Sequence, residues 1–90
     1  MRHREEWQPV LDAEVRRWSS KSSDQLITEL PEVRGYEVEF DGKKYQVEVE
    51  ILENTEKQIH VSVSVDDGKL LASIRPLSQS FVREKTIAKR

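Results

Sequence analysis

Alternating apolar and polar residues run from Tyr36 to Ile74, and two Asp-Gly dipeptides divide this run. An apolar residue at every second position is typical of strands that bury one face of a sheet. Asp-Gly between two such strands is typical of two-residue hairpin turns, because both turn positions need a positive φ. The sequence therefore predicts strands at about 35–40, 43–52, 58–66 and 69–75.

The first hairpin can be tested by its register, since directly opposed residues share one face of a sheet. With Asp41 and Gly42 as the turn, apolar residues meet apolar residues everywhere except beside the turn. The predicted pairs are Tyr36–Val47, Val38–Tyr45 and Phe40–Lys43, with Glu39 beside Lys44 on the reverse face. A slip of one residue would destroy this agreement.

The remaining strands extend the same pattern. Placing Ile51 opposite Ile59 keeps the apolar residues of the second and third strands on one face. Asp67 and Gly68 as a second turn would place Val61 opposite Ile74 in a fourth strand. The prediction is a four-stranded antiparallel meander with one apolar face.

Two helices are expected before the strands. The first, at about 5–18, has one apolar stripe at helical spacing, formed by Trp7, Leu11, Val15 and Trp18. Proline is tolerated in a first helical turn and harmful later, so Pro9 indicates that the regular helix begins near Gln8.

The second helix is expected at about 23–30. Ser22 and Gln25 have the spacing of a capping box, in which each side chain bonds the other residue's backbone N–H. Pro31 ends the helix, because a residue before proline avoids the α region.

These elements predict an α+β fold in one domain, residues 1–90, with both helices packed on the apolar face of the sheet. A short fifth element is possible near 77–82, and the charged tail 83–90 is expected to be flexible.

Composition excludes several kinds of site. The chain has no cysteine and two histidines, so we expect no metal centre and no cofactor. It has three glycines, two of which fit the hairpin turns, and this leaves no phosphate-binding loop. No apolar run approaches the roughly 18–20 residues of a membrane span, and residues 1–10 lack the apolar core of a signal peptide. We therefore expect a soluble, cytoplasmic protein that is not an enzyme.

Charge is distributed unevenly along the chain. The formal net charge is −2. Residues 32–56 carry eight acids and three bases, whereas residues 57–90 carry seven bases and three acids. The net charge of −2 argues against a dedicated nucleic-acid binder, which normally has a strong basic excess.

One group of polar residues is a candidate site. The expected registers place Glu50, His60 and Arg75 side by side on the polar face of the sheet. Glu beside His could orient an imidazole for proton transfer, and Arg could hold an anion. The alternative is a cross-strand ladder of charges on a solvated surface.

Glu14 is a second candidate, because it falls inside the apolar stripe of the first helix. A carboxylate among indoles could act as an acid. The alternative is that Glu14 lies at the margin of the stripe, with its carboxylate in solvent. Trp7 and Trp18 could anchor a partner, but filling the core is the more common role of such residues.

Three functions remain open. The first is a small non-enzymatic module for protein interaction or self-association through a sheet edge. The second is a small-ligand-binding or enzymatic domain, since a helix against a curved antiparallel sheet resembles the cystatin and NTF2-like architectures; that resemblance implies a cavity between helix and sheet. The third is weak nucleic-acid binding through the basic tail.

Overall fold

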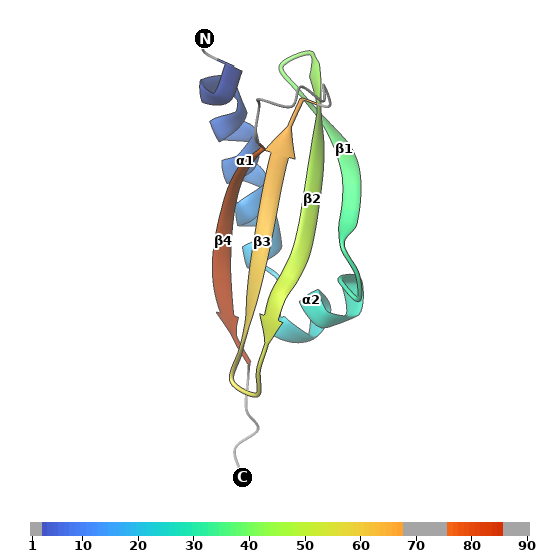
Figure 1. Cartoon of the computed structure of the whole chain (residues 1–90), viewed down its shortest axis with the longest axis vertical. Coiled ribbons are helices and arrows are strands. Elements are labelled where there is room, and N and C mark those ends of the chain that lie inside the picture. Colours follow the sequence, from blue (N-terminus) through green and yellow to red (C-terminus); the bar gives the residue numbers. More distant parts are fainter. Residues whose placement is uncertain (1–2, 68–75, 86–90) are drawn as a thin grey trace.

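The computed structural model describes residues 3–67 and 76–85. Its elements, in chain order, are α1 (His3–Ser19), α2 (Ser23–Glu29), β1 (Arg34–Phe40), β2 (Lys43–Asn54), β3 (Gln58–Asp66) and β4 (Leu77–Glu84). The strands form one antiparallel sheet in the order β1-β2-β3-β4 (Figure 1). The predicted α+β fold of two helices on a four-stranded meander is confirmed.

α1 is longer than expected, because it runs without interruption through Pro9. The prediction that the regular helix begins near Gln8 is wrong. Pro9 removes one backbone bond to residue 5, near the start of the helix, where the freed carbonyl can be hydrated. Trp7, Val10 and Leu11 are each no more than 2% exposed around that position, so their burial holds the turn in place.

α2 begins at the predicted capping box. The Ser22 hydroxyl accepts a hydrogen bond from the Gln25 backbone N–H at 3.2 Å. The Gln25 side chain accepts one from the Ser22 backbone N–H at 3.0 Å. Leu26 is fully buried, and it carries this short helix into the core.

The β1–β2 hairpin has the predicted register, with Tyr36 opposite Val47 and Val38 opposite Tyr45. Asp41 and Gly42 have φ values of 54° and 79°, as a two-residue type I′ turn requires. The turn residues therefore set the alignment of the whole hairpin.

The β2–β3 pair differs from the prediction. Ile51 lies opposite Val61 rather than Ile59, and the register shifts between Ile51 and Glu53. This shift is a β-bulge, which lets β2 continue to Asn54. Two registers that differ by two residues keep the same side chains on the apolar face, so alternation alone cannot choose between them.

The fourth strand also differs. Residues 69–75, the expected partner of β3, lie outside the described residues. β3 pairs instead with Leu77–Glu84, the segment expected only as a possible short fifth element or the start of a flexible tail. Val65 lies opposite Leu77 and Val61 opposite Phe81, so apolar residues still meet across the ladder.

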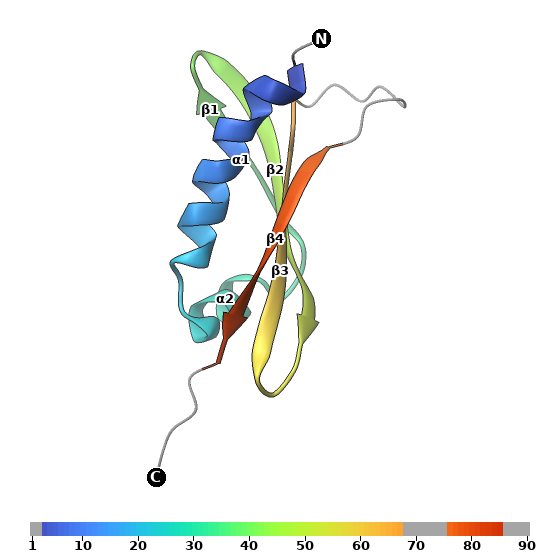
Figure 2. The same cartoon turned by 90° about the vertical axis from the view of Figure 1, so that its left-hand side faces the viewer.

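The core lies between α1 and the sheet (Figure 2). α1 runs along the apolar face, nearest to β4 and β3, and α2 covers one end of that face. The buried apolar residues are Trp7, Val10, Leu11, Trp18, Leu26, Leu30, Tyr45, Val47, Val49, Ile59, Val61, Val63 and Val65. None of the described helices has the length and apolar character to cross a membrane.

Candidate functional site

The predicted group of Glu50, His60 and Arg75 is not assembled as expected. Glu50 lies opposite Ser62, and His60 lies opposite Glu53. The bulge and the shifted register separate Glu50 from His60 by one full step of the ladder. Arg75 lies outside the described residues.

His60 contacts β4 instead of the predicted arginine. It lies opposite Val82, and its Nε2 is 2.9 Å from the Ser80 hydroxyl oxygen. Both His60 and Ser80 stand on the outer, polar face of the sheet. This pair links two strands on an exposed surface of the sheet.

Glu14 lies in a network of partly buried polar groups. The residue is 9% exposed, so the expectation that its carboxylate extends into solvent is wrong. The Tyr36 hydroxyl donates to Glu14 Oε1 at 2.6 Å, and Trp18 Nε1 donates to the Tyr36 hydroxyl at 2.7 Å. Arg17 adds a longer contact to the same oxygen at 3.4 Å. The network joins α1 to β1 across the core.

The chemistry of this network is structural. Burial, together with the hydrogen bond to Glu14, raises the pKa of Tyr36 to about 12. The phenol therefore keeps its proton throughout the physiological range and donates it to Glu14. A hydroxyl held in this way cannot serve as a general base near neutral pH.

Cationic side chains cover the outer side of Trp18. Lys21 lies 5.2 Å from the centre of its ring, and Arg17 and Arg34 each lie 5.9 Å away. Trp18 itself is 1% exposed, and Trp7 is 2% exposed. Both tryptophans therefore fill the core, and neither is available as an anchor for a partner.

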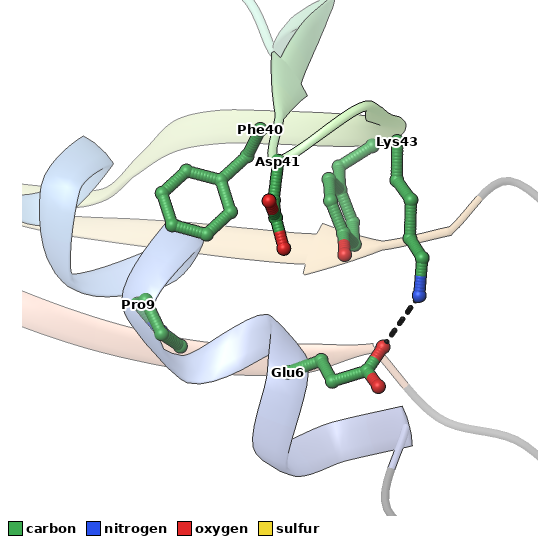
Figure 3. Close-up of a pocket in the computed structure, with 6 residues that line it drawn as sticks. Glu6, Pro9, Phe40, Asp41 and Lys43 are labelled. Carbon is green, nitrogen blue, oxygen red and sulfur yellow. Dashed lines mark hydrogen bonds and ion pairs between the residues drawn. The ribbon is translucent and has the colours of Figure 1, made fainter.

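A shallow hollow lies between α1 and the β1–β2 turn (Figure 3). It has a volume of about 240 Å³ and is lined by Glu6, Pro9, Phe40, Asp41, Lys43 and Tyr45. Lys43 Nζ donates to Glu6 Oε1 at 2.9 Å, and this hydrogen bond raises the pKa of Lys43. Sites for small molecules usually enclose about 300–1,000 Å³, so the hollow is small for a ligand site.

Metal binding finds no support in the part of the chain that the structure describes. No group of three or more His, Cys, Asp or Glu side chains there could hold an ion.

One free edge of the sheet is formed by β4, a segment that the sequence did not predict as the fourth strand. Lys85 N donates to Lys57 O at 2.8 Å, one step beyond the Gln58–Glu84 pair. Along an antiparallel strand, backbone groups alternate between facing the neighbour and facing away. The outward N–H and C=O groups of β4 therefore belong to Ser78, Ser80, Val82 and Glu84, and no described strand lies beyond them.

The side chains of β4 leave this edge accessible. Ser78, Ser80 and Val82 are exposed, and Val82 is 50% exposed. Natural proteins usually protect an edge with charge, proline or a bulge. No charged residue occurs in β4 before Arg83, and Pro76 precedes the strand without interrupting it.

β1, at the other edge of the sheet, is protected (Figure 1). Glu37 and Glu39 project from its outer face, where a second acidic strand would be repelled. Glu37 also accepts a hydrogen bond from Gln46 Nε2 at 3.3 Å. The two edges are therefore unequal, and β4 is the one suited to accept another strand.

Comparisons of this chain with protein-family models, with curated proteins and with solved structures give no significant match.

Proposed function

We propose that this protein is a small non-enzymatic interaction module that binds an extended chain along the free edge of β4. The single observation that carries the proposal is the row of outward backbone groups at Ser78, Ser80, Val82 and Glu84. An extended chain added to a sheet edge gains affinity from main-chain hydrogen bonds and specificity from the alternate side chains.

The neighbouring side chains support this function. Leu77 and Phe81 are half-buried on the inner face of β4, and Val82 is exposed on the outer face. An added strand would therefore meet apolar groups on both faces of the sheet. The charged residues Arg83 and Glu84 stand at one end of β4, where they would fix the direction of the added chain.

The two other functions have weaker support. The cystatin-like or NTF2-like interpretation needs a cavity between helix and sheet, and the hollow beside Phe40 has only about 240 Å³. Nucleic-acid binding depended on the tail 83–90. Arg83 and Glu84 belong to β4, and residues 86–90 lie outside the described part.

Ser80→Pro tests the proposal, because it removes one outward N–H and no bond to β3. Proline is accepted in an edge strand where its nitrogen faces solvent. Ser80→Ala is the matched control, since both variants lose the hydroxyl near His60. Random 12-residue peptides displayed on phage would be selected on the wild-type protein and then compared on both variants.

The expected result is a set of peptides that bind wild type and Ser80→Ala at least tenfold more tightly than Ser80→Pro. In NMR spectra, these peptides should shift the amide signals of Ser78, Ser80 and Val82 most strongly. Peptides that bind all three proteins equally, or no selected peptides at all, would contradict the proposal.

A further inference from the structure

We infer that the extended chain is β4 of a second copy of this protein, paired antiparallel about a twofold axis at Phe81. This inference rests on the proposed function, because it names the occupant of the same edge. Three features of β4 support it: the distribution of charged residues along the strand, the spacing of its outward backbone groups, and the position of Phe81.

Charge favours the antiparallel direction. A parallel, in-register pair of β4 strands would place the two Arg83 residues, and the two Glu84 residues, at the same level of the joined edge, where like charges repel. An antiparallel pair moves the charged ends apart. With the axis at Phe81, each charged residue of β4 lies opposite an uncharged one, because Arg83 faces Gln79 and Glu84 faces Ser78 of the second copy.

The outward backbone groups select one register. Ser78, Ser80, Val82 and Glu84 are centred on Phe81, so a twofold axis there pairs Ser80 with Val82 and Ser78 with Glu84 of the other copy. Every outward N–H and C=O of β4 then has a partner. An axis at Ser80 or at Val82 leaves some of these groups unmatched within β4.

Phe81 gains contact in this register. It lies on the inner face and is half-buried against the core. At the axis it would face the same residue of the second copy in a non-hydrogen-bonded pair, where opposing side chains come closest. Arg83 would lie beside Gln79 of the second copy, so no two like charges meet.

Sedimentation velocity of wild type and of the Ser80 variants, from about 5 to 500 μM, tests the partner. The monomer mass is 10.6 kDa, and we expect wild type and Ser80→Ala to reach twice that mass. Ser80→Pro should remain monomeric at every concentration, with the circular dichroism and melting temperature of a folded protein. A monomeric wild type at the highest concentration would overturn the inference.

Hydrogen exchange of the wild-type protein gives a test that needs no variant. The amides of Ser78, Ser80, Val82 and Glu84 should exchange more slowly as concentration rises. The amides of Gln79 and Phe81 face β3 and should be protected at all concentrations. Dimers in which the four outward amides exchange as fast as in the monomer would show that another surface is used.

Disulfide cross-linking tests which residues of the two copies lie opposite each other. The chain has no cysteine of its own, so each cross-link would come from an introduced cysteine. In a buffer with oxidised glutathione, the Ser80→Cys/Val82→Cys double variant should cross-link to covalent dimers at least tenfold faster than either single variant. Cross-linking of Ser80→Cys or Val82→Cys alone at the rate of the double variant would overturn the axis at Phe81.

The two proposals fail in different ways. A strictly monomeric wild type that still binds selected peptides through the Ser80 amide leaves the interaction module standing and removes the second copy as its partner. A wild-type dimer that is unaffected by Ser80→Pro and binds no such peptide contradicts both.

Discussion

Tyr36→Phe is the sharpest test of how this fold is held together. The change removes one hydroxyl that accepts from Trp18 Nε1 at 2.7 Å and donates to Glu14 Oε1 at 2.6 Å. Phe has nearly the same shape, so packing in the core is preserved. The variant therefore isolates the polar network from the apolar contacts around it.

The expected loss follows from the two broken bonds. Trp18 is 1% exposed, so its N–H is left without water, at a cost of about 1–3 kcal/mol. The lost bond to the Glu14 carboxylate would add about 1.5–3 kcal/mol if that group were fully buried. The Glu14 side chain is 12% exposed and keeps its contact with Arg17, so hydration offsets much of the second term. We expect the free energy of unfolding to fall by about 2–3 kcal/mol.

That loss is large for a chain of this size, whose total stability should be on the order of 5–13 kcal/mol. Urea unfolding followed by tryptophan fluorescence measures it directly, and the melting temperature should drop by about 10 °C. Tyr45→Phe is the control, since Tyr45 is buried, at 3% exposure, but lies outside the Glu14 network. It should cost less than about 0.5 kcal/mol, the size of an ordinary neutral change.

A double-mutant cycle separates the carboxylate from the indole. Glu14→Gln keeps an acceptor for the Tyr36 hydroxyl but removes the charge. In the Glu14→Gln protein, Tyr36→Phe should cost about 1 kcal/mol less than it does in wild type. If Tyr36→Phe unfolds within about 0.5 kcal/mol of wild type, the network does not stabilise the fold, and the reasoning is refuted.

Three further predictions concern pH, the core and the first turn. Because folding raises the pKa of Tyr36 from 10.0 to about 12, the stability from its protonated hydroxyl is complete below pH 10. This stability should be lost as the pH rises toward 12, and the loss should be about 1–2 kcal/mol after allowance for the partial exposure of Tyr36. Urea unfolding of wild type and of Tyr36→Phe at pH 9, 10.5 and 12 measures the loss. Leu26→Ala should lower the free energy of unfolding in urea by about 2–5 kcal/mol, because Leu26 is fully buried. Ile27 is 37% exposed, so Ile27→Ala should cost under about 1 kcal/mol. Equal losses in the two variants would contradict the position of α2. Gly42→Ala should cost about 1 kcal/mol because the φ of 79° is strained for alanine, and an unchanged melting temperature would count against the type I′ turn.

The sequence determined the β1–β2 pairing from Arg34 to Val49. Asp41 and Gly42 favour a two-residue type I′ turn, and that turn sets which residues of β1 and β2 lie opposite each other. The capping box at Ser22 likewise placed the start of α2. In both cases the deciding interactions join residues within a few positions of each other, so local rules were sufficient.

The candidate site depended on interactions that are distant along the chain. Helical spacing placed Glu14 in the apolar stripe, but it gave no sign of the Tyr36 hydroxyl, 22 residues away, that satisfies the carboxylate. The signal that was available is a tyrosine at an apolar strand position, because a buried phenol needs a polar partner. That partner was identified only in the folded chain, where the Tyr36 hydroxyl of β1 contacts Glu14 of α1.

Register and edge were decided by the tertiary structure. Alternation fixes which side chains share a face, yet it repeats every two residues, so it allowed Ile51 to face either Ile59 or Val61. It also allowed β3 to pair with 69–75 or with Leu77–Glu84. Packing under α1 chose one solution in each case, because backbone pairing is the same for every register of correct parity and only the fit of side chains against the helix differs.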